Sequence, residues 1–416
     1  MYLIYGDSME ILKHIEVNLQ KTVRFNQQDE GEFIGLPYPY TAPCVEEMFT
    51  SMYYWDTYFT NLGLISIGMA QQAKYNVDNM LYMVEKFGFM LNGNMTRYLN
   101  RSQPPFLCFM VKDVFEYFDD KQWLESVYKT LCKEYNFWQT ERQSENGLNF
   151  YGNYKAMEDK ALTNQYYNAF SERSGGYTTG DPDEKQKIAN TFMTHCESGW
   201  DCCSRFDFDG QFINPVCLNS LLYGFEAIMC EFSRVLGLND ESLWEKRAAT
   251  RKAKMQKYLW NEKEQLFMDW NFKDNRHSKV KSVASLYPMF VKLCDGVKGE
   301  KQLLEDLTLK YGIACSVKDN YRFPLQWDYP NVWAPLQYVS YKACKNYGLN
   351  EKANDIARRY INLIETNFEK TGNLWEKYDG NTGKVANQDY NAPTMMGWTA
   401  GVYLRFKYDL GEIEND

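Results

Sequence analysis

Residues 218–240 read LNSLLYGFEAIMCEFSRVLGLND, and this stretch shows the pattern that decides the fold of the chain. Its apolar residues recur at spacings of three, four and seven, the period of one buried helix face; they are Leu218, Leu222, Phe225, Met229, Phe232 and Val235. Gly237 can end this helix in the left-handed conformation, and Asn239 or Asp240 can cap a second helix that runs to about Tyr258. The stretch therefore predicts a helical hairpin.

A similar Gly-Leu-Asn-acid turn occurs at Gly348-Leu349-Asn350-Glu351, between two further helical patterns. One starts near Trp333, and the other carries Ile356, Tyr360, Leu363 and Phe368. Helical patterns also cover residues 57–88, 106–118, 121–137, 283–293, 301–309 and 394–409, with Asp119-Asp120 as a turn and N-cap. Strand patterns are scarce. About twelve helices in successive hairpins predict an all-α fold, a single (α/α)6 toroid of six helical hairpins over residues 1–416. An open solenoid would show a fixed repeat period, and this chain shows only the single recurrence of the Gly-Leu-Asn turn.

Residues at about 144–190 break the helical pattern. Asn, Tyr, Gly and Ser dominate there, and the apolar periodicity disappears. A loop of this length inside a compact domain is usually functional or disordered. We expect an ordered polar insertion over the mouth of a site.

Composition and charge exclude several classes of function. The net charge of −9 argues against a nucleic-acid partner, which would need clustered cations. No apolar run reaches the ~18 residues of a membrane span, and Asp7 and Glu10 interrupt the N-terminal apolar run, so we expect neither a membrane segment nor a signal peptide. The 11 scattered Cys are expected to be reduced thiols of a cytoplasmic protein. Without a C-x-x-C pair and with only three His, we expect no metal and no cofactor.

Aromatic residues stand beside acids in four segments that interrupt the helices. These segments are Tyr53-Tyr54-Trp55-Asp56, Trp200-Asp201, Gln326-Trp327-Asp328-Tyr329-Pro330 and Leu374-Trp375-Glu376-Lys377-Tyr378-Asp379. One Trp-Asp pair is more often a core tryptophan beside a helix cap. Four of them at helix junctions indicate a sugar site, because rings stack on a pyranose while carboxylates bind its hydroxyls. Hydrolysis of a glycoside needs a carboxylic acid and a second carboxylate, which Asp201 and Glu376 would supply.

Residues 326–335, QWDYPNVWAP, match the second signature of the trehalases, glycoside hydrolase family 37, position for position. Other segments are similar to the family in the same order along the chain, from about residue 45 to 405. They are Tyr53-x-Trp55-Asp56-x-Tyr58, Asn92-Gly93 with Arg101-Ser102-Gln103-Pro104-Pro105, Ser198-Gly199-Trp200-Asp201 with Ser204-Arg205, Glu376-Lys377-Tyr378-Asp379 and Gly397-Trp398-Thr399-x-Gly401.

This resemblance implies an (α/α)6 barrel and an inverting hydrolase that cleaves α,α-trehalose to glucose. Asp201 would be the general acid and Glu376 the base that activates water. The candidate substrate-binding residues are Trp55, Asp56, Asn92, Arg101, Gln103, Trp200, Arg205, Gln326, Trp327, Asp328, Trp333, Asp389 and Trp398. For Asp328 a binding or structural role is favoured over a catalytic one, and Arg205 has a plain salt bridge as its alternative.

The chain also departs from the trehalase pattern. In the stretch Val45-Glu46-Glu47-Met48-Phe49-Thr50-Ser51, Met48 replaces an arginine and Ser51 a glutamate of the first signature. A short segment, residues 380–384, replaces the glycine-rich lid and is similar to glycoside hydrolase family 63. The alternative substrate is therefore another small α-glucoside, α-mannoside or glycosylglycerate. Two other classes remain open: a sugar isomerase or epimerase, which commonly uses paired histidines, and a non-catalytic carbohydrate-binding scaffold.

Overall fold

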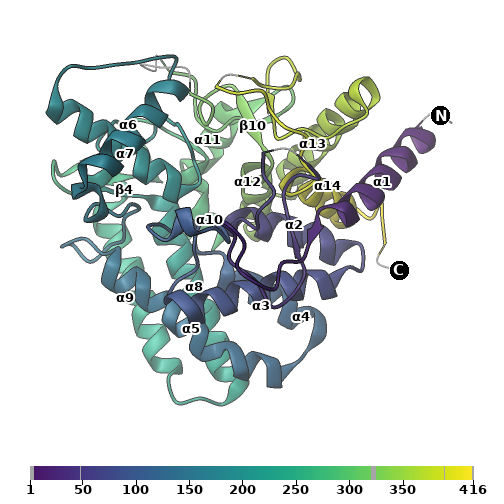
Figure 1. Cartoon of the computed structure of the whole chain (residues 1–416), viewed down its shortest axis with the longest axis horizontal. Helices are drawn as coiled ribbons and strands as arrows, with labels where there is room; N and C mark the ends of the chain where they lie inside the picture. The colour runs from purple at the N-terminus through teal and green to yellow at the C-terminus, as the bar shows by residue number, and fades with distance from the viewer. Residues whose placement is uncertain (1–3, 47, 320–324, 388, 415–416) are drawn as a thin grey trace.

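The computed structural model describes residues 4–46, 48–319, 325–387 and 389–414, and helices dominate it (Figure 1). The α-helices are α1 (Ile4–Lys21), α2 (Tyr54–Ser66), α3 (Ala70–Phe87), α4 (Leu107–Phe118), α5 (Lys121–Glu141), α6 (Lys160–Arg173), α7 (Pro182–Ser198), α8 (Val216–Leu236), α9 (Glu241–Tyr258), α10 (Tyr287–Phe290), α11 (Glu300–Leu307), α12 (Ala334–Asn346), α13 (Asn350–Thr371) and α14 (Trp398–Asp409). The mainly helical fold class is confirmed.

Strands in the described residues are only two or three residues long. They are β1 (Val23–Arg24), β2 (Tyr40–Thr41), β3 (Ile213–Asn214), β4 (Trp260–Asn261), β5 (Leu266–Phe267), β6 (Trp270–Asn271), β7 (Arg276–His277), β8 (Thr308–Leu309), β9 (Gly312–Ile313), β10 (Asn331–Trp333) and β11 (Lys377–Asp379). They pair antiparallel in small ribbons, β1 with β2, β4 with β5, β8 with β9, β10 with β11, and β3–β6–β7.

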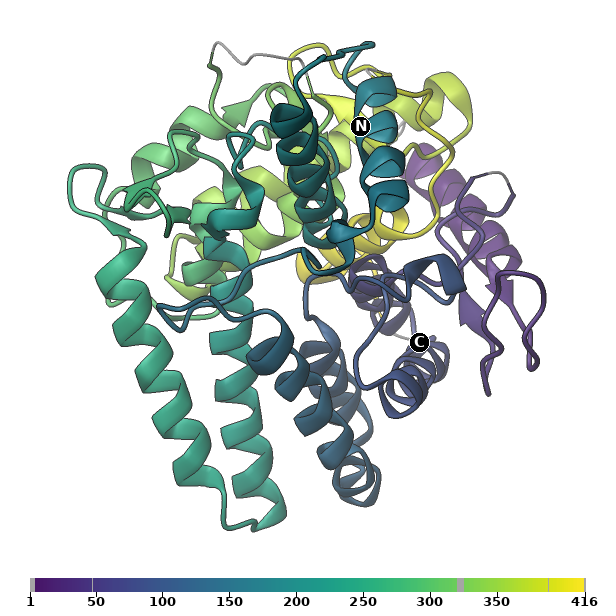
Figure 2. The ribbon, with the colours of Figure 1, turned by 60° about the vertical axis from the view of Figure 1, so that its left-hand side comes forward.

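Six helices contact one another in a closed cycle. The contacts pass from α2 to α4, α8, α10, α12 and α14, and α14 packs back on α2. Outside this cycle α3 covers α2 and α4, α5 covers α4 and α8, and α13 covers α12 and α14. Figure 2 shows α8 and α9 side by side as an antiparallel hairpin.

Two glycines allow α2 and α14 to approach backbone to backbone. A Cβ atom on Gly63 would lie 2.5 Å from the Cα atom of Gly401, and one on Gly401 would lie 2.1 Å from the carbonyl oxygen of Phe59. Any side chain at either position would push the helices apart. This contact joins the early part of the chain to its last helix.

The two sequence-predicted hairpins are confirmed. Gly237 has a φ of 67° between α8 and α9, and Gly348 has a φ of 72° between α12 and α13. Asp120 caps α5, because its side chain accepts a hydrogen bond from the Trp123 amide. The pattern over residues 57–88 is divided into α2 and α3 by a turn at Gly68 (φ 77°).

The prediction of a loop at 144–190 is wrong, because much of this region is helical. α6 and α7 pack against each other, and Asp159 and Asp181 cap their N-termini. The hairpin has a separate small core of mostly aromatic and sulfur-containing side chains, among them Met157, Tyr166, Tyr167, Phe170, Phe192, Met193 and Cys196. The sequence does not predict α6 because tyrosines, Tyr166 and Tyr167, supply part of its buried face. It does not predict α7 because polar residues such as Asn190 and Thr191 are buried there beside Phe192.

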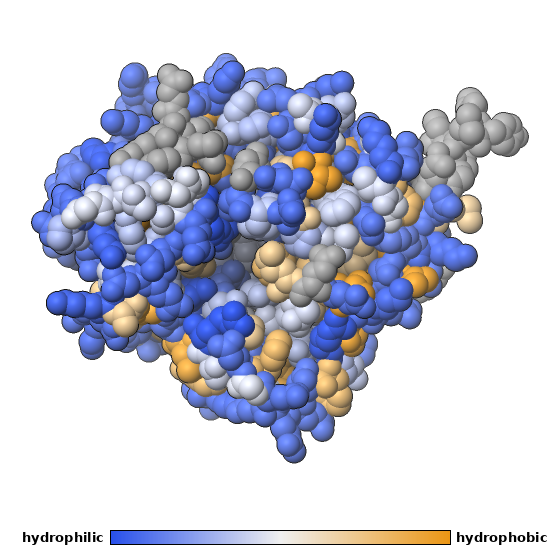
Figure 3. Space-filling model, turned by 45° about the horizontal axis from the view of Figure 1, so that its top comes forward, coloured by the Kyte–Doolittle hydropathy of each residue, from blue (hydrophilic) through white to orange (hydrophobic). Residues whose placement is uncertain are grey.

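Pairing of β10 with β11 brings two distant sequence segments together. Asn331 lies opposite Asp379, and Trp333 lies opposite Lys377. The trehalase-like signature is thereby fixed beside Glu376. Figure 3 shows a hollow in one face of the molecule, bordered mainly by hydrophilic residues.

No helix in the described part of the chain is long and apolar enough to cross a membrane. All 11 cysteines are free thiols, and most of them are buried.

Candidate active site

One cavity of about 130 Å³ collects residues from most of the predicted segments. Its walls come from the start of α2, the stretch 92–103, the end of α7, residues 326–333, Glu376 and the start of α14. The predicted residues that line it are Trp55, Asp56, Asn92, Arg101, Gln103, Asp201, Gln326, Trp327, Trp333, Glu376 and Trp398. The fold thus gathers both predicted catalytic carboxylates in one place.

Tryptophans build one wall of the cavity. The rings of Trp327 and Trp333 stack with centroids 4.0 Å apart and planes at 8°. Trp398 meets Trp333 edge to face at 5.7 Å, and Trp55 lies 5.6 Å from Trp327. The indole N–H of Trp333 donates a hydrogen bond to the carbonyl of Gln326 at 2.9 Å. The only polar group of this side chain therefore has a partner, and its apolar ring forms part of the cavity wall.

Glu197 anchors the loop that leads to Asp201. It is fully buried at the end of α7 and accepts a hydrogen bond from the amide of Ser102 at 2.8 Å. Arg142 at the end of α5 donates to both carboxylate oxygens, at 2.8 and 3.0 Å. Such bidentate pairs fix geometry as well as charge. Glu197 therefore ties α5 and the substrate-binding stretch to the acid loop.

Gly199 allows the loop to turn against the tryptophan wall. Its φ is 73°, and a Cβ atom there would lie within 2.6–2.9 Å of the Trp55 ring. A side chain is excluded by both the conformation and the contact. Asp201 follows this turn with its side chain 35% exposed, and its Oδ2 accepts a hydrogen bond from Arg173 at 3.0 Å.

Glu376 is held in a different environment. Its side chain is 3% exposed, the Tyr390 hydroxyl donates to Oε1 at 2.7 Å, and the Lys377 ammonium donates to Oε2 at 3.1 Å. Burial raises the pKa of Glu376 above its ordinary value, while Lys377 and Tyr390 oppose that rise. The Gln326 side chain also accepts from Lys377, at 2.8 Å, which fixes the ammonium.

An ion-pair chain connects the two carboxylates. Arg173 donates to Asp201 and, through Nε, to Asp389 at 3.1 Å. Lys377 lies 3.7 Å from the other oxygen of Asp389 and contacts Glu376. Asp201, Arg173, Asp389, Lys377 and Glu376 therefore form one continuous line of alternating charges that joins the two lining carboxylates.

A third carboxylate, Asp56, also lines the cavity. It is 8% exposed, and burial, reinforced by the charges of Glu376 and Asp201, raises its pKa well above the ordinary value. Beside it, Gln103 accepts from the Trp55 amide at 3.3 Å, and Arg101 donates to the Tyr166 hydroxyl at 2.6 Å.

Four candidate substrate-binding residues do not line the cavity. Trp200 is buried and stacks on Trp327 at 5.7 Å. The buried Arg205 makes a bidentate pair with Asp269, at 2.6 and 2.7 Å, so its guanidinium supports Trp200 and is not offered to a sugar. Asp328 accepts from the amide and hydroxyl of Ser204, a structural role, and Asp389 acts through Arg173 and Lys377.

Sequence reasoning missed several residues of the site. Arg173 comes from the region predicted to be a loop, and no pattern singled it out. Lys377 stands in a quoted segment but is not among the candidate residues. The lining residues absent from the candidate set are Phe49, Tyr53, Tyr98, Cys196, Gly199, Tyr390 and Met395. Tyr53 and Gly199 stand inside the quoted segments, and Tyr390 directly follows the candidate Asp389, so these three could have been included.

The first-signature departures lie at the edge of this region. Met48 is 56% exposed and Ser51 is buried, while Glu47 lies outside the described residues. Among the described residues, one group of three side chains has metal-ligating spacing, Cys230, Glu241 and Glu245. It lies on α8 and α9 away from the cavity, and Glu241 already pairs with Arg234.

Comparison with known proteins shows the family of this chain. The family model described as trehalase matches residues 8–410. The chain is 30% identical over 403 residues to a periplasmic trehalase of Escherichia coli, covering 91% of this chain and 70% of that protein. It is also 30% identical to a periplasmic trehalase of Pseudomonas aeruginosa, covering 90% and 72%.

Solved structures show the same relationship at the level of fold. The neutral trehalase from Saccharomyces cerevisiae superposes with a TM-score of 0.74 at 25% identity, covering 93% of this chain and 76% of that one. A family 63 mannosylglycerate hydrolase from Thermus thermophilus has a TM-score of 0.66 at 14% identity, covering 96% and 99%. The latter likeness concerns the fold alone.

Proposed function

We propose that this chain, which belongs to the trehalase family of glycoside hydrolases, cleaves α,α-trehalose to glucose with inversion at the anomeric carbon. Asp201 is the general acid and Glu376 the general base. The observation that carries the proposal is the convergence of both carboxylates, joined by one ion-pair chain, on a cavity walled by tryptophans.

The environments of the two carboxylates suit these two tasks. Asp201 is open to the cavity and can deliver a proton to the glycosidic oxygen as the bond breaks. Glu376 is buried, and its raised pKa makes its ionised form a stronger base towards a water molecule. The hydrogen bonds from Tyr390 and Lys377 hold both of its oxygens in place.

The fold that supports this site is an (α/α)6 toroid formed by a single domain. The closed cycle of α2, α4, α8, α10, α12 and α14 supplies its inner ring, and α1, α3, α5, α9, α11 and α13 its outer ring. The α6–α7 hairpin is then an insertion that brings Arg173 to Asp201.

A glycosylglycerate or another small α-glycoside is the second candidate substrate. The observation that favours it is Met48, exposed where the trehalase signature has an arginine. An isomerase is disfavoured, because none of the three histidines lines the cavity. A non-catalytic sugar-binding protein is disfavoured by the paired carboxylates.

A hydrolysis panel tests the proposal. Trehalose, kojibiose, nigerose, sucrose, glucosylglycerate and mannosylglycerate are offered separately, and glucose or mannose release is measured. Trehalose should give the highest kcat/KM, and proton NMR of the first turnovers should show β-glucose appearing together with α-glucose. Formation of α-glucose alone would reject inversion, and preference for a glycosylglycerate would replace trehalose by the second candidate.

The cytoplasmic location remains a proposal and rests on the thiols. Eleven free cysteines are typical of a reducing compartment. Cell fractionation with a trehalase assay of each fraction tests it, and activity in an exported fraction would contradict it.

A further inference from the structure

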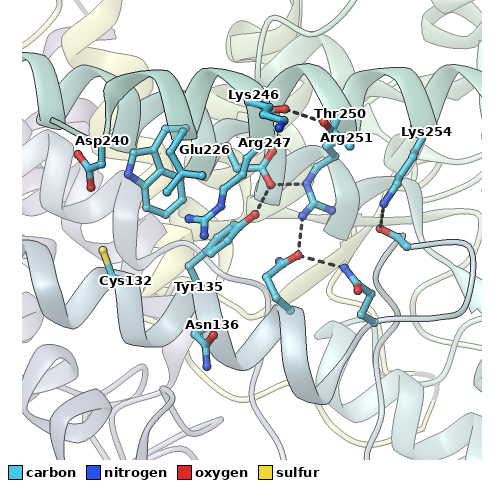
Figure 4. A pocket seen from close by; sticks show the side chains of 15 residues that line it. Cys132, Tyr135, Asn136, Glu226, Asp240, Lys246, Arg247, Thr250, Arg251 and Lys254 are labelled. Atoms are coloured by element: carbon cyan, nitrogen blue, oxygen red, sulfur yellow. Dashed lines mark hydrogen bonds and ion pairs between the residues drawn. The ribbon is translucent and has the colours of Figure 1, made fainter.

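A groove of about 530 Å³ lies between α5 and α9 and shares no lining residue with the catalytic cavity (Figure 4). One wall is α5, with Tyr135 and Gln139, and the other is α9, with Lys246, Arg247 and Lys254. Glu226 reaches the groove from α8. The groove is a separate polar site on the outer layer of helices.

Three cations of this groove have no acidic partner. Lys246, Arg247 and Lys254 lie along one face of α9, and no carboxylate in the described parts of the chain is within ion-pair distance of them. Lys254 donates only to the carbonyl of Gly147, at 3.2 Å. In a chain of net charge −9, three neighbouring cations without ion-pair partners are a local exception, although the carboxylates of Glu226 and Asp240 also line the groove. Like charges held close together repel, so an anion between them would be favourable.

Arg247 is held in a fixed orientation. Its guanidinium lies over the rings of Trp244 and Tyr135, 4.5 and 5.0 Å from their centroids. Both rings are almost fully buried, so they form a rigid support. Stacking leaves the N–H edge of a guanidinium available, and that edge matches the oxygens of a phosphate.

Two polar side chains of the groove each have one atom without a hydrogen-bond partner among the described residues. Glu226 is 1% exposed, and its Oε1 accepts from Tyr135 at 2.6 Å and from Arg251 at 2.8 Å. Its Oε2 is buried without a hydrogen-bond partner among the described residues. The amide nitrogen of Gln139 is buried and unpartnered in the same way, although its oxygen accepts from Arg251 and Gln143. Such groups are costly unless something satisfies them.

We propose that this groove binds a small phosphorylated sugar. Arg247, Lys246 and Lys254 would hold the phosphate. An acceptor at Glu226 and a donor at Gln139 would bind hydroxyl groups, which both donate and accept hydrogen bonds. The combination of free cations with an unpartnered acceptor and donor fits a phosphate ester of a sugar better than phosphate or sugar alone.

Calorimetric titration of the full chain with three probes tests this site: glucose 6-phosphate, glucose and inorganic phosphate. Glucose 6-phosphate should bind with a Kd of about 1 mM or tighter, and more tightly than glucose or inorganic phosphate alone. Arg247→Gln should weaken that binding at least about tenfold, since it removes charged hydrogen bonds. Lys257→Gln, an exposed change on the same helix outside the groove, should leave it unchanged.

A second variant guards against a folding defect. Thr250→Glu places a negative charge on the exposed side of the groove and should also weaken glucose 6-phosphate binding. All three variants should retain the natural melting temperature within a few degrees and full glycosidase turnover. The proposal is overturned if glucose 6-phosphate does not bind, or if it binds equally to Arg247→Gln, Thr250→Glu and Lys257→Gln. It is also overturned if glucose binds as tightly as glucose 6-phosphate, since the phosphate would then contribute nothing.

Discussion

Asp201 and Glu376 face the same cavity from segments that are built differently. Asp201 follows a helix end and a left-handed glycine, is partly open to solvent, and contacts one arginine. Glu376 precedes a short strand, is nearly inaccessible, and is held by a tyrosine and a lysine. The proposed acid is thus reached from the cavity, whereas the proposed base is set into the protein.

This difference separates the tasks of the two groups. A proton donor must follow the leaving oxygen as the glycosidic bond breaks, and a partly open side chain can do so. A base that orients one water gains from fixed oxygens and a raised pKa. The two carboxylates therefore need different surroundings, and substitutions should reveal their two roles separately.

Removal of either carboxylate is expected to have the largest effect. Asp201→Asn and Glu376→Gln should each lower kcat for trehalose by about 10²–10⁴, because each removes a proton-transfer group. With α-glucosyl fluoride, whose leaving group needs no proton, Asp201→Asn should recover much of its activity and Glu376→Gln should not. Steady-state kinetics on both substrates measure this, with the exposed Glu172→Gln as control. Equal losses on the fluoride would contradict the assignment of roles.

Lys377→Met should have the next largest effect. It leaves two buried carboxylates, Glu376 and Asp389, without their shared cation, which should cost about 3–5 kcal/mol in the free energy of unfolding. Lys377 also lowers the pKa of Glu376, so its loss should raise that pKa further. Because the base must be ionised, the acidic limb of the pH–kcat profile should move to higher pH, and kcat at neutral pH should fall about 10–100-fold.

Urea unfolding and a pH–rate profile measure these two effects of Lys377→Met. The exposed Lys384→Met, close to the same strand, is the matched control. An acidic limb that stays in place or moves to lower pH would show that Lys377 does not act on the base.

Arg173→Gln should lower kcat about tenfold. The guanidinium positions Asp201 through Nη1 and Asp389 through Nε, and no single ammonium can reproduce both contacts, so Arg173→Lys should not restore the rate. The free energy of unfolding should fall by about 1–3 kcal/mol, less than in Lys377→Met. Asp201 is partly exposed, but Asp389 is only 3% exposed and would keep Lys377 alone as its cation. Lys160→Gln, on the exposed start of the same helix, should change neither quantity. A natural kcat in Arg173→Gln would show that the ion-pair chain is not needed for turnover.

Asp328→Asn should have the smallest effect, although Asp328 belongs to the long signature. Its side chain serves Ser204 and does not line the cavity, so kcat should stay within about threefold of the natural value. Burial raises the pKa of Asp328 to about 7, whereas an unfolded aspartate titrates near ~3.9. The carboxyl of Asp328 therefore stays protonated to a higher pH in the folded state than in the unfolded state. The natural protein should lose stability relative to Asp328→Asn as pH rises from about 4 to 7. Urea unfolding at both pH values checks the sign.

Local sequence signals accounted for much of the helical architecture. Gly237 and Gly348 are left-handed helix ends, and Asp120 is an N-cap, because these residues act through nearby backbone. The pairing of strands that are far apart in the sequence could not be predicted in this way. The register of Trp333 opposite Lys377 depends on strands of three residues, too short to carry a pattern.

The candidate site was predicted where motifs were quoted and missed where the partner came from elsewhere. Resemblance led to Asp201 and Glu376, and both line the cavity. Arg173 could not be found, because its helix buries tyrosines in place of an aliphatic stripe. Arg205 was expected at the sugar, but only the fold reveals that Asp269 already binds its guanidinium.

The glycine contact between Gly63 and Gly401 bears on when the protein becomes active during its synthesis. α2 carries Trp55 and Asp56, and α14 carries Trp398, so the cavity needs two segments that lie far apart in the sequence. A growing chain on the ribosome cannot close the cavity until α14 has left the exit tunnel. Activity is therefore expected to appear only after α14 has emerged, and no chain that stops before α14 should hydrolyse sugar.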